Sequence, residues 1–580
     1  MKTFFGSLYH AFATANKVHL LWCAGLLVLM LILAILHHRW RDEPSKLSVW
    51  RWLCLLPAAA VITHYFLYVH GAPDLLFGFI YMYVIAVFAL ILMPFAKRRI
   101  GYRIAAVPVA LLTLAAGFLG CGEAPNFYNF TRQSYTESFR SLIKTMDKIY
   151  ILKEWKDVDF AALEAKYLPA VQEAEDAQDP AKFTDAVALM ACELHDGHVD
   201  VMGDFDEEQY KSALDWKDYG LAAIRLDSGE VIAVYTSEEV QKLGIADGTV
   251  LTKWNGKPIL QAAEEDVLDD CDPVVTNGAV YRVMSVCGTG GDTVDVSYTD
   301  KDGSEKTVTL TECSSEGTLP TVMKALYTFA SFTPLRTAEA KQAFTDENYG
   351  TRMLNDKCGY LRLNAETTGD NTKDIIGYLT GDQKWSRERF REGLRSLKKQ
   401  GMEYLIVDLR CNHGGFDEVG CALCDLLTTE DWYGQGLGVR KKDGSYVCVS
   451  DHGIHGDGEF ADLPVLALTN MRCVSAGDGT SLYLSKLPNV TVAGMTNPNG
   501  CNQETGGRCV LSGGVVTVAF PTGLILDENG DPNIDTRADR VSRNPVDVHI
   551  PLDYDAAMKI FRDDQDYELD WAISYLEQNS

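Results

Sequence analysis

The chain opens with long apolar runs that are separated by short polar connections. Four such runs occupy residues 18–36, 52–70, 75–95 and 104–121. Each is close to the roughly 20 residues that an α-helix needs to cross a bilayer. The pattern therefore predicts that residues 1–121 form a four-helix transmembrane region in contact with membrane lipid.

The charges between these runs predict an orientation. Lys and Arg are concentrated in the first and third connections, whereas the second carries only Asp74. Short basic loops stay on the cytoplasmic side of a membrane. We therefore expect a multi-pass protein of the plasma membrane, with both chain ends and the rest of the chain extracytoplasmic.

Residues 122–205 follow the pattern of amphipathic helices, with apolar positions recurring at spacings of three and four. We expect a helical subdomain here. It ends in the segment Leu194-His-Asp-Gly-His198, in which Asp-Gly indicates a tight turn. His198 is thus predicted to follow a helix on a turn.

Residues 206–312 change to short alternating strands. Residues 240–259 run from a helix end through Asp247-Gly248, a strand and an Asn-Gly turn. This order resembles the central part of a PDZ domain, a fold that binds extended peptides by adding a strand to a sheet edge. The resemblance implies a PDZ-like peptide-docking domain, with Tyr219, Gly220 and Leu221 near the carboxylate-binding loop.

In residues 313–580 apolar strands alternate with amphipathic helices, which predicts an α/β domain. One strand, 405–409, leads into a glycine-rich loop that ends at Gly414 and Gly415. Another, 464–468, leads through a turn to a helix that begins near Ser475. Glycines free backbone amides to point into a site, and a helix start supplies unpaired amide donors. Both features suit the stabilisation of an oxyanion.

Ser475 alone has a simpler interpretation. Ser-Ala-Gly-Asp is also a helix-capping pattern, in which the serine hydroxyl accepts hydrogen bonds from the first turn of the helix. Spacing by itself therefore leaves two alternatives open, a capping serine and a nucleophile.

Charge and cysteine content argue against a nucleic-acid-binding protein and against a metal site. The chain has a net charge of −27, although residues 1–121 hold ten Lys or Arg against three Asp or Glu. The remaining chain is therefore strongly acidic and lacks the basic clusters that bind nucleic acid.

Cys421 and Cys424 form a C-x-x-C without a second pair or a histidine cluster. We therefore expect these cysteines to pack in the core, and we expect no metal and no cofactor.

The ordered motifs resemble the C-terminal processing peptidase and tricorn core family of serine peptidases. The segment Asp408-Leu-Arg-Cys-Asn-His-Gly-Gly415 matches the family's DLRxNxGG. The segment Cys473-Val-Ser-Ala-Gly-Asp478 resembles its T-A-S-A-x-E, and residues 194–198 match L-x-D-G-H of the tricorn-like branch. The resemblance implies a ClpP/crotonase-like α/β catalytic domain. It also implies site residues, namely Ser475 as nucleophile, Ala476, Gly414 and Gly415 at the oxyanion hole, and Asp408, Arg410 and Asn412 shaping the loop.

This chain differs from the better-known family members at the general base, for which those members use a lysine. The corresponding turn, 494–501, contains no lysine, and only Lys486 and Lys559 follow Ser475. Lys486 would lie about 16 Å along the same helix at roughly 1.5 Å per residue. The tricorn-like branch uses histidine, which implies His198 as base, with His195 its neighbour.

The motifs define the orienting carboxylate less clearly. In the tricorn-like branch a glutamate stands shortly before the terminal proline, which here resembles Pro545, and this resemblance implies Asp539 as a candidate, with Glu504 as another. The chain as a whole is then predicted to be multidomain, with boundaries at 1–121, 122–205, 206–312 and 313–580. We expect a membrane-anchored serine endopeptidase that acts on proteins or peptides through a Ser475 acyl-enzyme. The alternative is a peptidase-like protein that binds or senses peptides without turnover.

Overall fold

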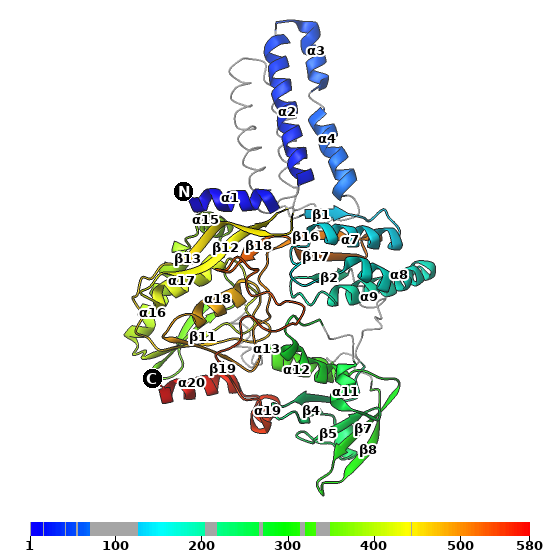
Figure 1. The fold of residues 1–580 in the computed structure, drawn as a ribbon, viewed down its shortest axis with the longest axis vertical. Coiled ribbons are helices and arrows are strands. Elements are labelled where there is room, and N and C mark those ends of the chain that lie inside the picture. The colour runs from blue at the N-terminus through cyan, green and yellow to red at the C-terminus, as the bar shows by residue number, and fades with distance from the viewer. Residues whose placement is uncertain are drawn as a thin grey trace.

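The computed structural model describes most of the chain. The described residues are 2–14, 17–40, 42–53, 56–69, 126–203, 217–265, 271–313, 320–331, 348–441 and 443–579. Figure 1 shows the helices of residues 17–64 standing away from a larger body of mixed helices and strands.

The N-terminal helices are α1 (Lys2–Thr14), α2 (Lys17–Trp40), α3 (Pro44–Leu53) and α4 (Leu56–His64). A π-helical turn, Tyr65–Val69, continues α4. α2 packs beside α3 and α4 (Figure 1), and Trp50 donates its indole N–H to Leu33 O at 2.7 Å. α1 lies instead against the body of the protein, in contact with β13 and α15.

The prediction of four membrane-spanning helices is wrong for the described residues, because none of their helices has the length and apolar character of a bilayer span. Within the second expected span, 52–70, the described residues belong to α3, α4 and the π-helical turn, whereas residues 54, 55 and 70 lie outside the described residues. The expected spans 75–95 and 104–121 lie outside the described residues. The same finding overturns the predicted location as a multi-pass protein of the plasma membrane.

The helical region after residue 122 consists of α7 (Tyr135–Ile149), α8 (Phe160–Ala177) and α9 (Pro180–Cys192). α7 begins with a capping box between Ser134 and Glu137, which satisfies amides that the first helical turn leaves unpaired. The helices pack on a four-stranded sheet in the order β1-β16-β17-β2. Its strands are β1 (Asn126–Asn129), β16 (Thr505–Val510), β17 (Val516–Pro521) and β2 (Asp200–Gly203).

The strand-rich region contains two small antiparallel sheets, β3-β4 and β6-β5-β7-β8. Helices α12 and α13 pack against β3. The strands are β3 (Leu221–Arg225), β4 (Val231–Thr236), β5 (Leu251–Trp254), β6 (Lys257–Pro258), β7 (Thr293–Thr299) and β8 (Glu305–Thr311). The helices are α10 (Glu238–Lys242), α11 (Ile259–Glu264), α12 (Val275–Val286) and α13 (Thr321–Ser331).

A six-stranded sheet with the order β19-β15-β14-β11-β10-β9 forms the α/β region. Its strands run parallel except for β9, which is antiparallel to β10. They are β9 (Tyr349–Met353), β10 (Cys358–Leu363), β11 (Tyr404–Asp408), β14 (Val465–Leu468), β15 (Val490–Gly494) and β19 (Val548–His549). β12 (Trp432–Arg440), β13 (Tyr446–Ile454) and β18 (Leu524–Leu526) make a separate antiparallel sheet.

Helices surround this sheet. They are α15 (Asn371–Thr380), α16 (Lys384–Lys399), α17 (Asp417–Leu427), α18 (Ala476–Ser485), α19 (Tyr554–Phe561) and α20 (Tyr567–Asn579). Cys421 and Cys424 are buried on α17 within the apolar cluster that covers one face of the sheet.

The apolar clusters connect segments that are distant in the chain. Residues of the helical region share one cluster with β16, β17 and β18, while β3 and β4 share another with β10, β11 and β14. β11 and β14 are paired in parallel, with Asp408 opposite Leu468. Because the carboxyl ends of parallel strands meet at one edge, the loops 409–415 and 469–475 start side by side.

Candidate active site

Ser475 lies at the junction between the loop after β14 and helix α18. Its backbone has φ 61° and ψ −131°, which is a strained conformation for a residue with a side chain. Its N–H donates to Cys501 O at 3.0 Å, and the N–H of Val474 donates to Asn412 O at 3.0 Å. The Ser475 side chain makes no capping hydrogen bond to α18. The capping interpretation of this serine is therefore not what the structure displays.

The glycine-rich loop after β11 lies directly against Ser475. A Cβ built on Gly414 would come within 2.5 Å of Ser475 Cβ, and Gly414 has φ 78°. Gly415 has φ 149° and packs on the Glu366 carbonyl. The N–H of Gly414 donates to Asn412 Oδ1 at 2.8 Å, and the N–H of Glu366 donates to Gly414 O at 3.0 Å. Only glycine fits both positions, because a side chain would meet the neighbouring loop.

Asn412 connects this loop to a buried glutamate that the sequence did not indicate. The Asn412 Nδ2 donates to Leu363 O and to Glu366 Oε1, each at 2.9 Å. Thr480 Oγ1, on α18, donates to the same carboxylate oxygen at 3.0 Å. Burial raises the pKa of Glu366 to about 8, although the hydrogen bonds from Thr480 and Asn412 oppose the shift. Glu366 is therefore protonated near neutral pH and holds both loops through one side chain.

Asp408 and Arg410 support the same loop from beneath. Both side chains are fully buried, and Arg410 Nη2 donates to Asp408 Oδ2 at 2.8 Å. Arg362 Nη1 donates to Asp408 Oδ1 at 2.7 Å. Burial opposes ionisation of Asp408, but Arg362 and Arg410 hold its pKa below the usual value. Arg410 also pairs with Asp566 at 2.7 Å and Glu568 at 3.2 Å, which ties the loop to the C-terminal segment.

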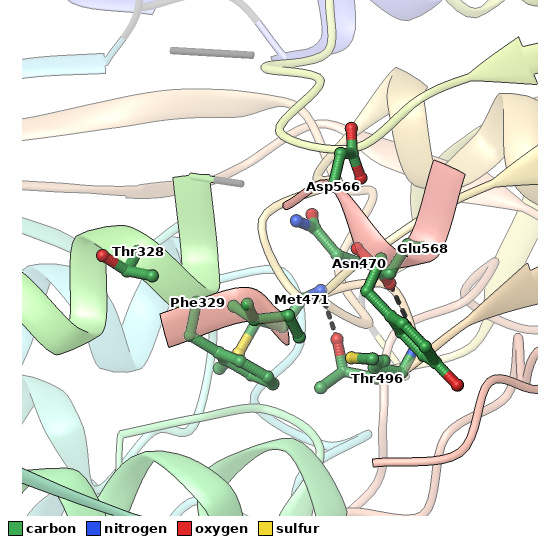
Figure 2. Close-up of a pocket in the computed structure, with 10 residues that line it drawn as sticks. Thr328, Phe329, Asn470, Met471, Thr496, Asp566 and Glu568 are labelled. Atoms are coloured by element: carbon green, nitrogen blue, oxygen red, sulfur yellow. Dashed lines mark hydrogen bonds between the residues drawn. The ribbon is translucent and has the colours of Figure 1, made fainter. Parts of the chain in front are cut away.

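A pocket opens beside this C-terminal segment (Figure 2). Figure 2 shows Thr328 and Phe329 of α13 on one side of the pocket and Asp566 and Glu568 on the other. Asn470 and Met471, from the loop before Ser475, lie between them. Met471 N–H donates to Thr496 Oγ1 at 2.8 Å. Neither Ser475 nor His198 lines this pocket. It therefore neighbours the loop before Ser475 without containing Ser475 or His198.

His198 lies on the loop between α9 and β2. Its N–H donates to Asp196 Oδ1 at 2.9 Å, and Tyr150 OH donates to Asp196 Oδ2 at 2.8 Å. Ligand atoms of His198, Asp196 and Cys501 lie within 4.8 Å of one another. Burial lowers the pKa of His198, and the neighbouring Asp196 opposes this shift. Because the Cys501 carbonyl accepts the Ser475 N–H, Cys501 links the His198 loop to the serine.

The two carboxylates proposed from sequence lie elsewhere. Asp539 is exposed and accepts a hydrogen bond from Val541 N–H at 3.2 Å. Glu504 forms an ion pair with His10 of α1, with 3.0 Å between its Oε2 and the His10 Nε2. Burial would raise the pKa of Glu504, but His10 holds it below the usual value. The structure therefore does not bring either carboxylate into the Asp196–His198–Cys501 cluster.

Asp535 is a buried carboxylate that sequence reasoning missed. Its Oδ2 accepts from Asn502 N–H at 3.1 Å and from Gln503 Nε2 at 2.6 Å. Burial and the nearby Asp196 raise its pKa to about 7. The only sequence signal was the expected position of a carboxylate before Pro545, and Asp535 lies four residues before Asp539 in that segment.

Asp478 joins three of the motifs. Its Oδ2 accepts from Gly500 N–H at 2.6 Å, and its Oδ1 accepts from Asn544 Nδ2 at 2.7 Å. Burial raises the pKa of Asp478 to about 7. One side chain thus holds together the start of α18, the turn at residues 494–501 and the segment that begins at Asn544.

The loop proposed for docking precedes β3. Gly220 has φ 69°, donates its N–H to Asp218 Oδ1 at 2.8 Å and accepts from Ser237 N–H at 2.8 Å. Tyr219 donates its hydroxyl to Gly291 O at 2.6 Å, and both Tyr219 and Leu221 are buried. The loop is therefore ordered by its own hydrogen bonds.

Comparisons with known proteins agree with the resemblance of the motifs. Residues 357–536 match the model of peptidase family S41. No curated protein sequence matches the chain. Among solved structures, mature CPAF complexed with lactacystin is 13% identical, with a TM-score of 0.46, and the match covers 77% of this chain and 99% of that one.

Two further solved structures are similar in the same range. The photosystem II D1 C-terminal processing protease is 16% identical, with a TM-score of 0.33, over 74% of this chain and 97% of that one. The tricorn protease is 13% identical, with a TM-score of 0.32, over 77% of this chain and 37% of that one. The matched family region, 357–536, contains both the glycine-rich loop and Ser475. The match of this region to peptidase family S41 indicates a serine-type peptidase, whose substrates are proteins or peptides.

Proposed function

We propose that the peptidase is an endopeptidase in which Ser475 forms an acyl-enzyme and His198 acts as general base. In the first step the Ser475 hydroxyl attacks the scissile carbonyl, and its proton moves to a ring nitrogen of His198. His198 then gives that proton to the leaving amine. A water molecule, deprotonated by His198, hydrolyses the acyl-enzyme and restores the serine.

The observation that carries this proposal is the backbone of Ser475. A residue in a strained conformation at a helix start, whose side chain does not cap the helix, presents its hydroxyl for another purpose. The N–H of Ala476, the first residue of α18, lies ahead of the helix's own hydrogen-bond ladder and is a natural oxyanion donor. We assign the second donor to the Gly414–Gly415 loop, where the Gly414 N–H would exchange Asn412 Oδ1 for the oxyanion.

A histidine base agrees with the electrostatics of its loop. Burial lowers the pKa of His198 and favours the neutral imidazole, which is the form that accepts a proton. Asp196 opposes that shift and stabilises the imidazolium formed during attack. We therefore propose Asp196, rather than Asp539, as the positioning carboxylate, with the buried Asp535 reinforcing the negative potential beside it.

The lysines that follow Ser475 do not favour a serine–lysine pair. Lys486 is the C-cap residue that follows the far end of α18, and Lys559 belongs to α19. Lys156, which is buried near the His198 loop, donates to His195 O at 2.9 Å and to Thr536 Oγ1 at 3.2 Å. These bonds assign Lys156 to holding the loop.

We also propose that substrate docks at the PDZ-like region near Tyr219, Gly220 and Leu221. The left-handed Gly220 at the start of β3 supports this role, since such loops bring backbone amides close to a chain end. Because α13 packs against β3, a peptide can add as a strand beside β3 only if α13 moves away. A fluorescent peptide with a free C-terminal carboxylate should bind the full chain and lose at least tenfold in affinity with Gly220→Val. Equal binding by both proteins would refute this docking site.

Fluorophosphonate labelling of the full chain tests the catalytic assignment. Wild type should label at Ser475, and Ser475→Ala and His198→Ala should both lose labelling and peptide cleavage. Ser485→Ala, on the same helix, and His195→Asn, on the same loop, are matched controls that should retain both activities. Asn tolerates the positive φ of His195. A folded wild type that neither labels nor cleaves peptides would instead favour a peptide-binding protein without turnover.

A further inference from the structure

Three metal-ligating side chains of different chemistry meet beside the proposed base. Candidate ligand atoms of Asp196, His198 and Cys501 lie within 4.8 Å of one another, and this is the one such group of three among the residues that the structure describes. Asp196 and His198 come from the loop after α9, whereas Cys501 comes from the turn that follows β15. The group is therefore assembled by tertiary structure, from two segments far apart in the chain.

An unsatisfied ring nitrogen marks the same place. His198 Nδ1 is buried and has no hydrogen-bond partner within the described residues. A buried polar atom without a partner is costly, so such atoms commonly have a ligand or a solvent molecule beside them. The Cys501 thiol is also buried and contacts Asn499 Oδ1 at 2.7 Å. A cation that accepts electron pairs from both nitrogen and sulfur would satisfy these two buried atoms.

The donor set selects the class of ion. One imidazole nitrogen, one thiolate and one carboxylate oxygen match the ligands of Zn²⁺, whereas Mg²⁺ and Ca²⁺ require oxygen ligands alone. Zinc bonds of roughly 2.0–2.3 Å place tetrahedral ligands about 3.3–3.8 Å apart. Ligand atoms at up to 4.8 Å must therefore approach one another by at most about 1.5 Å to reach this geometry. Three protein ligands leave the fourth position for water, as in an exchangeable site.

We propose that Asp196, His198 and Cys501 form an inhibitory zinc site in this peptidase. Binding breaks the S–H bond of Cys501, so that each Zn²⁺ forms a Zn–S bond and releases that proton to solvent. A ring nitrogen of His198 gives its lone pair to the metal and no longer accepts the proton of Ser475. The inhibitory half rests on the proposed function of His198; the binding half does not.

Cobalt absorption tests the binding half without any activity measurement. Full-length protein without a tag, kept free of reductant so that the Cys192–Cys271 disulfide stays closed, is titrated with Co²⁺. Wild type should develop visible bands of tetrahedral Co²⁺ and a near-ultraviolet thiolate band, which Zn²⁺ displaces at one equivalent. Cys501→Ser should lose the thiolate band, and His198→Asn should weaken binding at least tenfold. Cys448→Ser, at an exposed free cysteine, should behave as wild type.

Peptide cleavage with and without Zn²⁺ tests the inhibitory half. The zinc concentration that halves cleavage by wild type should rise at least tenfold in Cys501→Ser, each protein being compared with its own metal-free rate. Circular dichroism confirms that each variant is folded. A wild type without cobalt bands, or a Cys501→Ser variant that keeps them, overturns the site whether or not the protein cleaves peptides. Zinc binding that leaves cleavage of an active enzyme unchanged overturns the inhibitory role.

Discussion

Gly414 is in contact with Ser475 across the two loops that follow β11 and β14. A Cβ on Gly414 would meet Ser475 Cβ at 2.5 Å and Ser475 Oγ at 3.0 Å. Real Cβ atoms do not approach a neighbour so closely, so one of the two loops would have to move. The position of the serine hydroxyl therefore depends on the absence of a side chain at residue 414.

We expect Gly414→Ala to reduce kcat/KM by at least about 100-fold, the scale of losing one oxyanion donor. The methyl group would displace Ser475, and φ 78° is strained for alanine. Gly369→Ala is the matched control, because Gly369 has φ 76° but nothing within 4 Å of the added Cβ. Steady-state peptide cleavage measures both. Equal losses in the two variants would mean that backbone strain alone, and not contact with Ser475, explains the effect.

Asp196→Asn should change both the rate and its pH dependence. The neutral imidazole is the active base, so kcat/KM rises with pH through the pKa of His198. Asp196 raises this pKa, so its loss should move the acidic midpoint to lower pH. The plateau rate should fall by at least about tenfold, toward the roughly 10⁴-fold loss known for a removed orienting carboxylate.

Asp539→Asn is the comparison for this experiment, because Asp539 is exposed and bonded only to a neighbouring amide among the contacts described. Its pH profile should coincide with that of wild type. A midpoint that shifts with Asp539→Asn and stays constant with Asp196→Asn would reverse our assignment of the positioning carboxylate.

Glu366→Gln should make stability less dependent on pH. The folded pKa of Glu366, about 8, lies above its ordinary value of 4.5. Such a group stabilises the fold fully below pH 4.5, and this contribution is lost as pH rises through about 8. Glutamine mimics the protonated form, so the variant should gain melting temperature relative to wild type between pH 5 and pH 8.

Glu403→Gln is the control, since Glu403 is an exposed residue that pairs with Lys357. Thermal unfolding at both pH values compares the three proteins. All three proteins should still lose some stability as the pH rises, because they retain three other buried carboxyls whose pKa values are raised to about 7, namely Asp417, Asp478 and Asp535. If the Glu366→Gln variant lost as much stability between pH 5 and pH 8 as wild type, Glu366 would be ionised in the fold.

Opening the Cys192–Cys271 disulfide should destabilise the protein by about 2–4 kcal/mol, because it closes a loop of 79 residues. Cys192 ends α9, directly before the His198 loop. Reductant should therefore lower the melting temperature of wild type and leave a Cys192→Ala/Cys271→Ala double variant unchanged. Cys448→Ser should respond to reductant as wild type does. If the melting temperature of wild type were the same with and without reductant, the disulfide would not be formed in solution.

The strands and loops near Ser475 were predictable because local sequence patterns indicate them. The apolar run before Asp408 and the run before Thr469 became β11 and β14, and the glycines at 414 and 415 adopt the positive φ that their residue type allows. The membrane prediction rested on hydropathy and loop charges, and it failed because no helix among the described residues combines the length and the apolar character of a bilayer span.

The sequence by itself determined the glycine-rich loop and the α/β strands, because each depends on neighbours within a few residues, whereas the candidate nucleophile and base came from the resemblance of the ordered motifs to a known family. Only the tertiary structure decided what else lies beside His198 and its neighbour in sequence, Asp196. Cys501 joins them from a distant chain segment whose packing no local pattern encodes, whereas Asp539, at a plausible sequence distance, turns outward to solvent. Burial, which sets the pKa values of Glu366, Asp478 and Asp535, is likewise a property of the assembled core.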